Sequence, residues 1–239
     1  MIEAHLLKLR ARDDLSAEEE QAIRASVSEV IEVPPDKTII RAGDRLTSST
    51  LLLDGILCRY KDLSEGQRQI TELHVTGDFA DLHSFTLKRL DHNVMTLTRC
   101  RIALVPHDRL KSITRDHPHL TRLYWFSTNL DASIHREWEV SLGRRSAISR
   151  MAHLFCELRV RLGIVGQAEE SGYALPLTQT DLAECLGLTP VHVNRTLKVL
   201  RERGLLAFRG GRVDIQDLPG LERVAEFDPA YLYLERQSQ

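Results

Sequence analysis

The stretch LTQTDLAECLGLTPVHVNRTLKVLRERGLL, Leu177 to Leu206, predicts two short helices joined by a tight turn. Thr178 is a good N-cap residue, and Asp181 three positions later stands at the acidic position of a capping box. A first helix is therefore expected over about residues 179–186. Gly187 supplies the left-handed residue that ends this helix.

The second helix of this stretch has a basic outer face. Thr189 caps it, and Pro190 takes the first helical position, where the missing N–H costs nothing. Val193, Leu197 and Leu200 recur at helical spacing and are expected to point inward. The positions expected to point outward are Pro190, Val191, Asn194, Arg195, Lys198 and Arg201. Such a pair is typical of a helix-turn-helix, whose second helix enters the major groove of DNA.

A β-hairpin is expected directly after these helices. AFRGGRVDI, Ala207 to Ile215, contains two short strand-like runs around Gly210 and Gly211. A hairpin at this place is the wing of a winged helix-turn-helix. The alternative is an ordinary helical hairpin with a solvated charged face, but the caps, the turn, the inward triplet and the wing together favour a DNA-binding module.

Charge is unevenly spread along the chain. The 239 residues carry a formal net charge of -2, so the whole molecule is not a polycation. From Pro176 to Arg212, however, six Lys and Arg residues face three acids, a local balance of +3. Arg144 to Arg161 adds five arginines against Glu157. Local positive charge of this kind suits contacts to DNA phosphates.

The cysteines and the apolar runs exclude several classes of protein. The four cysteines show no C-x-x-C spacing, which argues against a disulfide framework and an iron–sulfur cluster: Cys58, Cys100, Cys156 and Cys185. We expect them to be buried free thiols. Neither a membrane-spanning apolar run nor a signal-peptide pattern is found, so we expect a soluble, cytoplasmic protein with no membrane partner.

Short β-rich runs separated by turn signals occupy about residues 28–106. The runs are VIEVPPDKTII, TLLLDGILCRY, RQITELHV, HNVMTLTR and CRIALVP. Their spacing predicts an antiparallel β-roll or jelly roll. A capping box from Ser16 to Glu19 opens a short helix before it, which we take as the first helix of the chain. With the helices that follow, the predicted fold class is α+β.

One long helix is expected from about residue 119 to residue 142, where Gly143 should end it before Ser146 caps the next helix. Its apolar positions recur in alternating steps of three and four, which is close to a coiled-coil seam. The predicted dimer interface consists of Leu120, Leu123, Ser127, Leu130, Ile134 and Trp138. The alternative is a helix packed on its own barrel. A helix-turn-helix usually reads a two-fold site as a dimer, which favours a homodimer.

Three parts follow from this order of elements. Residues 1–118 form a β-roll sensor domain, residues 119–142 a dimerisation helix, and residues 143–239 a winged helix-turn-helix DNA-binding domain.

This order resembles the Crp/Fnr family over nearly the whole chain. PPDKTIIRAGD (Pro34 to Asp44) with LLLDG (Leu51 to Gly55) is similar to the family's opening roll motif, and VTGDFADLHSF (Val75 to Phe85) to its Gly-Asp-Phe turn and short helix. The helix-turn-helix stretch is the most specific match. The resemblance implies a homodimeric, sequence-specific transcription regulator and not an enzyme. Double-stranded DNA is the expected partner, with RNA polymerase as a further one.

The resemblance also assigns DNA contacts. Arg195 falls on the family's main base-reading arginine, which can pair bidentately with guanine. Val191 stands where many members carry a glutamate, and Pro190 replaces a side chain that often reads a base. Asn194 could address adenine. Expected phosphate contacts are Thr178, Gln179, Thr189, His192, Lys198, Arg209 and Arg212.

The sensor departs from the cyclic-nucleotide binders of the family. These show a glutamate for the ribose and an Arg-Ser/Thr pair for the phosphate, whereas this chain has Asp81 in the short helix and Leu90-Asp91 near the pair. An aspartate there repels a phosphate by at least about 1 kcal/mol. We therefore expect an unknown effector other than cyclic AMP. The candidate effector pocket is Asp81, Leu82, His83, Arg89, His135 and Arg136.

Other sensor types are weaker alternatives. A cyclic-nucleotide-responsive regulator stays open, with Arg89 as the rescuing cation. The oxygen-sensing branch needs an N-terminal cysteine cluster, which residues 1–28 lack. A facial triad for non-haem iron, of the kind that jelly-roll enzymes of the cupin type carry, would use side chains from His74, Asp81, His83 and His92 and would make the protein a metal-binding sensor or an enzyme. Haem ligation by one of these histidines is a further alternative. No metal and no cofactor are assigned.

Overall fold

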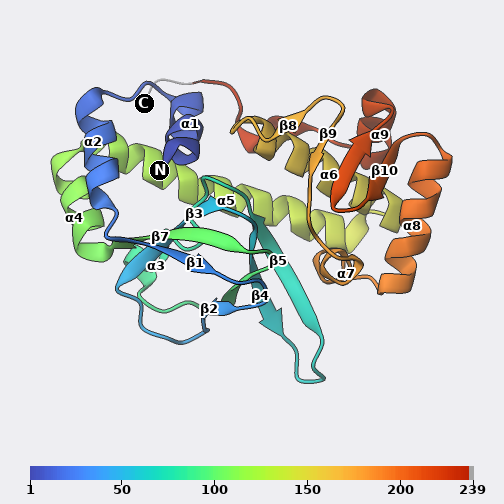
Figure 1. Cartoon of the computed structure of the whole chain (residues 1–239), viewed down its shortest axis with the longest axis horizontal. Coiled ribbons are helices and arrows are strands. Elements are labelled where there is room, and N and C mark those ends of the chain that lie inside the picture. Colours follow the sequence, from blue (N-terminus) through green and yellow to red (C-terminus); the bar gives the residue numbers. More distant parts are fainter. Residues whose placement is uncertain (237–239) are drawn as a thin grey trace. The chain divides into compact units, whose positions relative to one another are not determined.

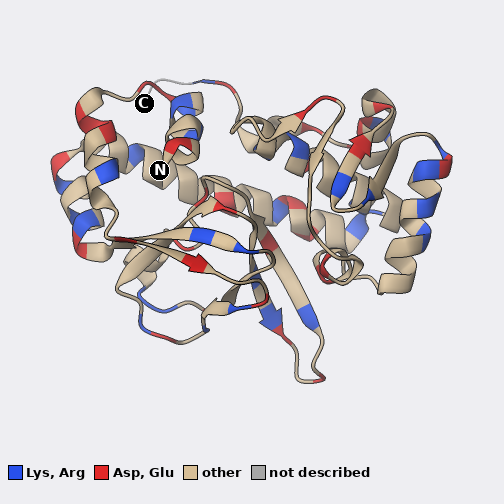
Figure 2. Cartoon of the chain, in the orientation of Figure 1, with Lys and Arg blue, Asp and Glu red and all other residues tan. Residues whose placement is uncertain are grey.

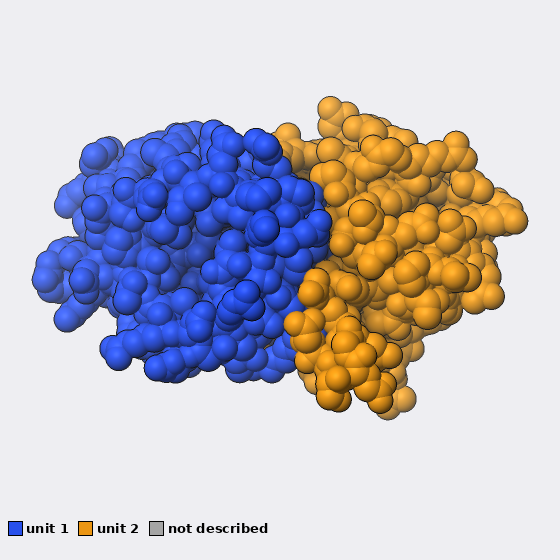
Figure 3. Space-filling view, turned by 60° about the horizontal axis from the view of Figure 1, so that its bottom comes forward, with its two compact units in different colours: residues 1–61, 73–133, 233–239 blue, residues 62–72, 134–232 orange. Residues whose placement is uncertain are grey.

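The computed structural model describes residues 1–236, and the chain folds into two compact units (Figure 1, Figure 3). The first contains residues 1–61, 73–133 and 233–236, and the second contains residues 62–72 and 134–232. Among the described residues, no helix is both long and apolar enough to cross a membrane.

Apart from residues 62–72, which belong to the second unit, the predicted roll lies in the first unit and is built from two antiparallel sheets (Figure 1). One sheet has the order β1-β7-β3, with β1 at Glu29–Val33, β7 at Cys100–Pro106 and β3 at Ser48–Asp54. The other has the order β2-β6-β4-β5, with β2 at Thr38–Ile40, β6 at Asn93–Thr96, β4 at Leu57–Asp62 and β5 at Arg68–His74. The β-rich runs of the sequence therefore form strands, as predicted.

The roll closes around a core of aliphatic side chains. Leu52, Leu57 and Val94 have no exposed surface and pack together with Ile102. Gly55 allows the tight turn between β3 and β4, because its φ is +97° and a Cβ there would lie 2.6 Å from the Arg99 carbonyl oxygen. The Asp54-Gly55 turn signal thus has a steric cause.

Short helices accompany the roll. α2 (Ala17–Ser26) begins at the predicted capping box, in which Ser16 Oγ accepts from the Glu19 amide. It is not the first helix of the chain, because α1 (Glu3–Arg12) precedes it. α1 has no side-chain N-cap, which is why the capping signals missed it, although Leu6 and Leu9 on its inner face are buried. α3 (Ser84–Leu87) and α4 (His107–Asp116) complete this group.

The long helix α5 spans Pro118–Arg144 and continues through Gly143, so the prediction that Gly143 ends it is wrong. Gly143 does not have the positive φ that glycines adopt at turns and helix ends of this chain. The helix instead ends before Ser146, whose Oγ accepts from the Ser149 amide and caps α6 (Ala147–Gly163) as predicted.

The second unit contains the helix-turn-helix and a small sheet. α6 lies beside α7 (Gln179–Leu186), α8 (Pro190–Glu202) and α9 (Leu218–Ala225), and a 3-10 helix follows at Pro229–Leu232. The sheet has the order β10-β11-β9-β8, with bounds Leu206–Arg209, Arg212–Ile215, Gly172–Ala174 and Ala168–Glu169. β8 and β9 were not predicted; they extend the expected wing to four strands. The combination of helices with antiparallel sheets confirms the predicted α+β fold class.

Candidate nucleic-acid interface and effector region

We call the helix-turn-helix formed by α7 and α8 the reader. Its first helix, α7, begins and ends where its sequence predicts. Thr178 Oγ1 accepts from the Asp181 amide at 3.1 Å, and the Asp181 carboxylate accepts from the Thr178 amide at 2.7 Å. These two bonds satisfy amides that the first turn of a helix leaves without partners. Gly187 follows in the left-handed conformation, with φ 60° and ψ 40°.

The second helix buries one face. Thr189 Oγ1 accepts from the His192 amide at 3.2 Å, as expected of a cap. Val193 and Leu200 are fully buried, as predicted, but Leu197 is only half-buried. The third buried position is Thr196. Its hydroxyl donates to the His192 carbonyl at 2.9 Å, so a polar side chain can lie inside without an unsatisfied group.

The opposite face of α8 is open to solvent and carries Arg195, Lys198 and Arg201, and Figure 2 shows the Lys and Arg positions of this helix. Val191 is 77 % exposed, and Pro190, Asn194, Arg195 and Lys198 are exposed as well. Arg195 makes no ion pair or hydrogen bond with any residue between 1 and 236. Its guanidinium therefore keeps all its donors for a ligand.

The other predicted phosphate contacts surround this face. Thr178, Gln179 and Thr189 are exposed at the starts of α7 and α8, and His192 is half-buried. Asn194 Nδ2 donates to Gln179 Oε1 at 3.4 Å, which ties the two helices together on the exposed side.

The wing places two more arginines next to its turn. β10 and β11 pair in register, so Arg209 stands opposite Arg212 next to the turn. Gly210 and Gly211 both have positive φ, 58° and 73°, as a two-residue hairpin requires. Arg212 pairs with Asp214 at 2.8 Å, and both side chains are about half exposed.

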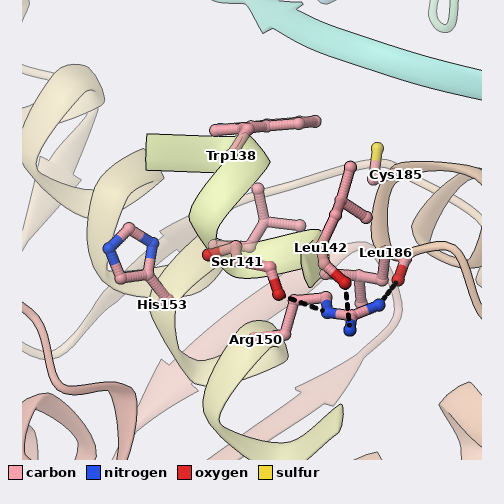
Figure 4. Close-up of a pocket in the computed structure, with 8 residues that line it drawn as sticks. Trp138, Ser141, Leu142, Arg150, His153, Cys185 and Leu186 are labelled. Atoms are coloured by element: carbon pink, nitrogen blue, oxygen red, sulfur yellow. Dashed lines mark hydrogen bonds between the residues drawn. The ribbon is translucent and has the colours of Figure 1, made fainter. Parts of the chain in front are cut away.

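Arg150 anchors the reader within the second unit. Its guanidinium donates to the Ser141 carbonyl at 3.0 Å, to the Leu142 carbonyl at 2.9 Å and to the Leu186 carbonyl (Figure 4). The Leu142 and Leu186 carbonyls lie in the last turns of α5 and α7, where a helix leaves carbonyls without helical partners, whereas the Ser141 carbonyl also accepts from the Arg145 amide at 3.3 Å. One side chain thus fixes the end of the first reader helix to the end of α5.

A second anchor comes from the strand hairpin in the same unit. Gln69 Nε2 donates to the Glu184 carbonyl at 2.8 Å and to the Cys185 carbonyl at 3.3 Å. Neither Arg150 nor Gln69 was predicted, because the carbonyl ends that they satisfy are distant in the sequence.

The predicted dimer seam points into the protein instead. Leu120 and Leu123 have no exposed surface and belong to the core of the first unit. Ile134 is 3 % and Trp138 6 % exposed. A side chain covered by its own chain has no surface left for a second copy, so these four assignments are corrected. Ser127 and Leu130 are half-buried.

A different stripe of α5 faces outward. It also runs in steps of three and four, and it consists of Arg122, Trp125, Asn129, Ala132 and Arg136. Trp125 is 68 % exposed, and Val140, one turn beyond the stripe, is 50 % exposed. Large apolar side chains on a solvent-facing helix stripe are typical of an interaction surface.

Comparisons with known proteins agree over both units. Residues 30–117 match the family model of the cyclic nucleotide-binding domain, and residues 149–224 match that of the Crp-like helix-turn-helix domain. The nitrogen fixation regulation protein FixK of Bradyrhizobium diazoefficiens is 30 % identical over 194 residues, which cover 79 % of this chain and 78 % of FixK. The chain belongs to the Crp/Fnr family.

Further Crp/Fnr members support this assignment. The transcriptional activator FnrL of Cereibacter sphaeroides is 27 % identical over 180 residues, 74 % of this chain and 71 % of FnrL. The solved structure of FixK2 from Bradyrhizobium japonicum superimposes with a TM-score of 0.75 at 24 % identity, covering 83 % of this chain and 97 % of FixK2. FixK is a regulation protein and FnrL a transcriptional activator, and this Crp/Fnr protein is likewise a transcription regulator and not an enzyme.

The predicted effector residues of this Crp/Fnr protein divide between its units. Asp81, Leu82, His83 and Arg89 belong to the first unit, whereas His135 and Arg136 belong to the second. Asp81 and Leu82 are buried, His83 is half-buried and Arg89 is exposed, where it donates to the Gly43 carbonyl. His135 Nδ1 lies 3.4 Å from the buried Glu72 carboxylate, and Arg136 is exposed.

Asp81 is held inside the roll. Its Oδ1 accepts from the Thr50 amide at 2.5 Å, and the side chain has no exposed surface. Burial raises the pKa of Asp81 to about 6, and the hydrogen bond from Thr50 only partly opposes this. The carboxyl group is thus part of the roll's interior structure.

Arg59 is a buried cation that sequence reasoning missed. Its guanidinium donates to the Ala80 carbonyl at 2.8 Å and to Asp131 at 2.9 Å, with only 4 % of the side chain exposed. All four residues from Leu57 to Tyr60 are buried, so β4 shows no alternation of buried and exposed positions that could have marked Arg59.

The histidines proposed for iron do not form a triad. The rings of His83 and His92 lie 5.5 Å apart, while His74 is fully buried on β5. In the part of the chain that the structure describes, no group of three His, Cys, Asp or Glu side chains has an arrangement that could hold a metal ion.

Proposed function

We propose that this Crp/Fnr regulator binds a two-fold DNA operator as a homodimer, with α8 of each copy in the major groove. The exposed and unpaired Arg195 on α8 is the observation that carries the proposal. A guanidinium with all its donors available can pair with O6 and N7 of guanine. Residues 1–118 then act as the sensor domain, residues 119–142 as the dimerisation helix and residues 143–239 as the DNA-binding domain.

The neighbours of Arg195 set the rest of the readout. Val191 cannot accept a hydrogen bond from cytosine but can pack on a thymine methyl, and Pro190 reads by shape alone. Asn194 addresses adenine. The phosphate contacts come from the helix starts, His192, Lys198 and the wing arginines Arg209 and Arg212, since all of them except the half-buried His192 are exposed.

The experiment is an unbiased DNA selection with wild-type protein and Arg195→Ala. Removing the guanidinium should weaken specific binding by about 1–3 kcal/mol and relax the preference at one G·C pair in each half-site. Arg101→Ala serves as the matched control, because Arg101 is also exposed but lies on β7 of the roll. An unchanged consensus with Arg195→Ala would refute the base-reading role.

The homodimer is proposed to form through the outward stripe of α5, because Trp125 offers it a large exposed ring. Trp125→Glu would remove the only large apolar side chain of this stripe and would bring a carboxylate from each copy into the interface, so that both the lost apolar burial and the like charges oppose association. Sedimentation should then show a monomer. Leu87→Glu is the control, since Leu87 on α3 is similarly exposed at 62 %. A protein that remains dimeric with Trp125→Glu but becomes monomeric with Leu87→Glu would show that the interface lies on α3 and not on α5.

The effector is proposed to be a molecule other than cyclic AMP. A phosphate needs a cation, but Arg89 donates to Gly43 on the exposed surface and the buried Arg59 is paired with Asp131. Calorimetry with cyclic AMP and cyclic GMP, together with operator binding with and without each, tests this proposal. Micromolar binding coupled to tighter operator binding would establish the cyclic-nucleotide alternative. RNA polymerase as partner and the cytoplasm as location belong to the same proposal.

A further inference from the structure

The outward stripe of α5 carries a single amide side chain. Asn129 lies there between Trp125, one turn before it, and Ala132, one turn after it, and all three residues are exposed. They belong to the first unit. Asn129 makes no hydrogen bond with any residue between 1 and 236, so its donors and its acceptor are available to a partner.

The spacing of the stripe decides what Asn129 meets in a homodimer. Arg122, Trp125, Asn129 and Ala132 follow one another in steps of three, four and three, which is the alternation of the a and d positions of a heptad. In a parallel pair of such helices in register, a residues pack against a residues and d residues against d residues. Each side chain of the stripe then faces its own copy across the two-fold axis.

An asparagine is suited to face its own copy. Two identical charges at the axis repel each other, and two apolar side chains form no hydrogen bond. The amide group contains both a donor and an acceptor, so Nδ2 of one copy can donate to Oδ1 of the other. Asn129 is therefore self-complementary at a two-fold axis.

Other arrangements of the two helices leave this amide unsatisfied. In an antiparallel pair, or in a shifted register, Asn129 packs against a different stripe residue of the second copy. The alanine methyl group forms no hydrogen bond, and the indole and guanidinium groups only donate, so none of them accepts from the Asn129 amide. A buried donor without a partner costs free energy, and each such dimer contains two of them.

We propose that Asn129 pairs with Asn129 of a second copy of the chain and thereby fixes the homodimer as parallel and in register. This inference rests on the homodimer proposed above and adds the residue that selects its geometry. Trp125 supplies apolar area for association, whereas Asn129 disfavours the other arrangements of the same two helices.

The first test is Asn129→Asp in the full chain, because aspartate has nearly the same shape but no donor. Two carboxylates then face each other, and the dimer dissociation constant from sedimentation should rise about thirtyfold near pH 7. This factor corresponds to about 2 kcal/mol, to which the lost hydrogen bond and the repulsion each contribute about 1 kcal/mol. Gln67→Glu is the matched control, since it adds the same charge at an exposed amide outside the stripe and should leave the constant unchanged.

The second test measures the register by disulfide formation. Ala132→Cys adds an exposed thiol, whereas the four native cysteines are buried. In the proposed dimer the two added thiols face each other, so mild oxidation should cross-link most of the dimer. Ser112→Cys, at an exposed position of α4, should not cross-link.

Asn129→Leu, combined with Ala132→Cys, removes the amide from the stripe. The protein should remain dimeric in sedimentation, because leucine adds apolar area to the interface. The cross-linked share should nevertheless fall, because the other arrangements no longer bury an unpaired donor.

The outcomes separate the role of Asn129 from the homodimer itself. An unchanged dissociation constant with Asn129→Asp, a dimer that Ala132→Cys does not cross-link, or an undiminished cross-linked share with Asn129→Leu would each overturn the inference. A dimer that is lost with Trp125→Glu but keeps its affinity with Asn129→Asp refutes only the role of Asn129. A wild-type chain that sediments as a monomer refutes the homodimer as well and assigns the stripe to a different protein.

Discussion

The phenolic hydroxyl of Tyr231 donates a 2.9 Å hydrogen bond to the fully buried carboxylate of Glu157. Trp138 Nε1 donates to the same carboxylate at 3.1 Å, and Arg161 donates at 2.9 Å. Glu157 thus has several donors and a compensating charge, which a buried carboxylate needs. This cluster explains why Trp138 faces inward and cannot serve a dimer seam.

Removing one donor from this cluster should destabilise the second unit. We expect Tyr231→Phe to lower the free energy of unfolding by about 1–3 kcal/mol, because a buried charged acceptor loses a partner. Tyr233→Phe is the matched control: Tyr233 is 50 % exposed, and its variant should change stability by less than about 0.5 kcal/mol. Urea unfolding measures both, and equal effects would contradict the role of the Glu157 cluster.

Arg150→Lys should loosen the anchor of the reader. A lysine keeps the charge but lacks the planar fork that reaches Ser141, Leu142 and Leu186 together. We expect a loss of about 1–3 kcal/mol in unfolding free energy. Arg144→Lys, at an exposed position, should have no measurable effect. If the two variants unfold at the same urea concentration, the fork geometry does not matter.

The raised pKa of Asp81 predicts that the stability of the folded protein depends on pH, and it fixes the sign of this dependence. Its folded pKa, about 6, lies above its ordinary value of 3.8, so the folded state keeps a proton that the unfolded state loses. The stabilising contribution is therefore complete below about pH 4 and is lost as pH rises through 6. Asp81→Asn retains an acceptor for the Thr50 amide but does not titrate.

Relative to wild type, Asp81→Asn should therefore gain about 2 kcal/mol in stability between about pH 4.5 and about pH 7.5. The comparison cancels the contributions of other groups, such as His5, whose lowered pKa acts in the opposite direction. Urea unfolding at both pH values checks this, and a constant difference would show that Asp81 titrates normally.

Lys198→Ala should reduce the salt dependence of operator binding without changing sequence preference. If each copy in a dimer loses one phosphate contact, the slope of log affinity against log salt should fall by about two. Lys198 is available for this contact, since its ion pair with Glu202 is long, at 3.7 Å, and exposed. Lys111→Ala on α4 is the control and should leave the slope unchanged.

The reader was predictable because its signals are local. Thr178 with Asp181, Gly187, and Thr189 with Pro190 each act within four residues of their own position, so both ends of α7 and the start of α8 follow from sequence alone. The exposed face of α8 follows from the same spacing. The burial of Thr196 was not predicted, because threonine is normally found on the polar face of a helix.

The long helix shows where sequence reasoning reaches its limit. α5 carries two stripes at the same heptad-like spacing, one through Leu120 and Leu123 and one through Trp125. Periodicity identifies both but does not say which one the chain covers itself. Tertiary packing decides that, and it also decides the burial of Arg59, whose partner Asp131 lies 72 residues away.

The tail of the chain returns to the first unit. Glu235 accepts a hydrogen bond from Arg12 and Tyr233 packs against Phe126, although residues 134–232 of the second unit intervene. On the ribosome, which delivers the chain from its N-terminus, the first unit to emerge thus lacks some of its own contacts until the second has been synthesised. The unit that begins first is completed last, and a single break in the chain cannot yield both units intact.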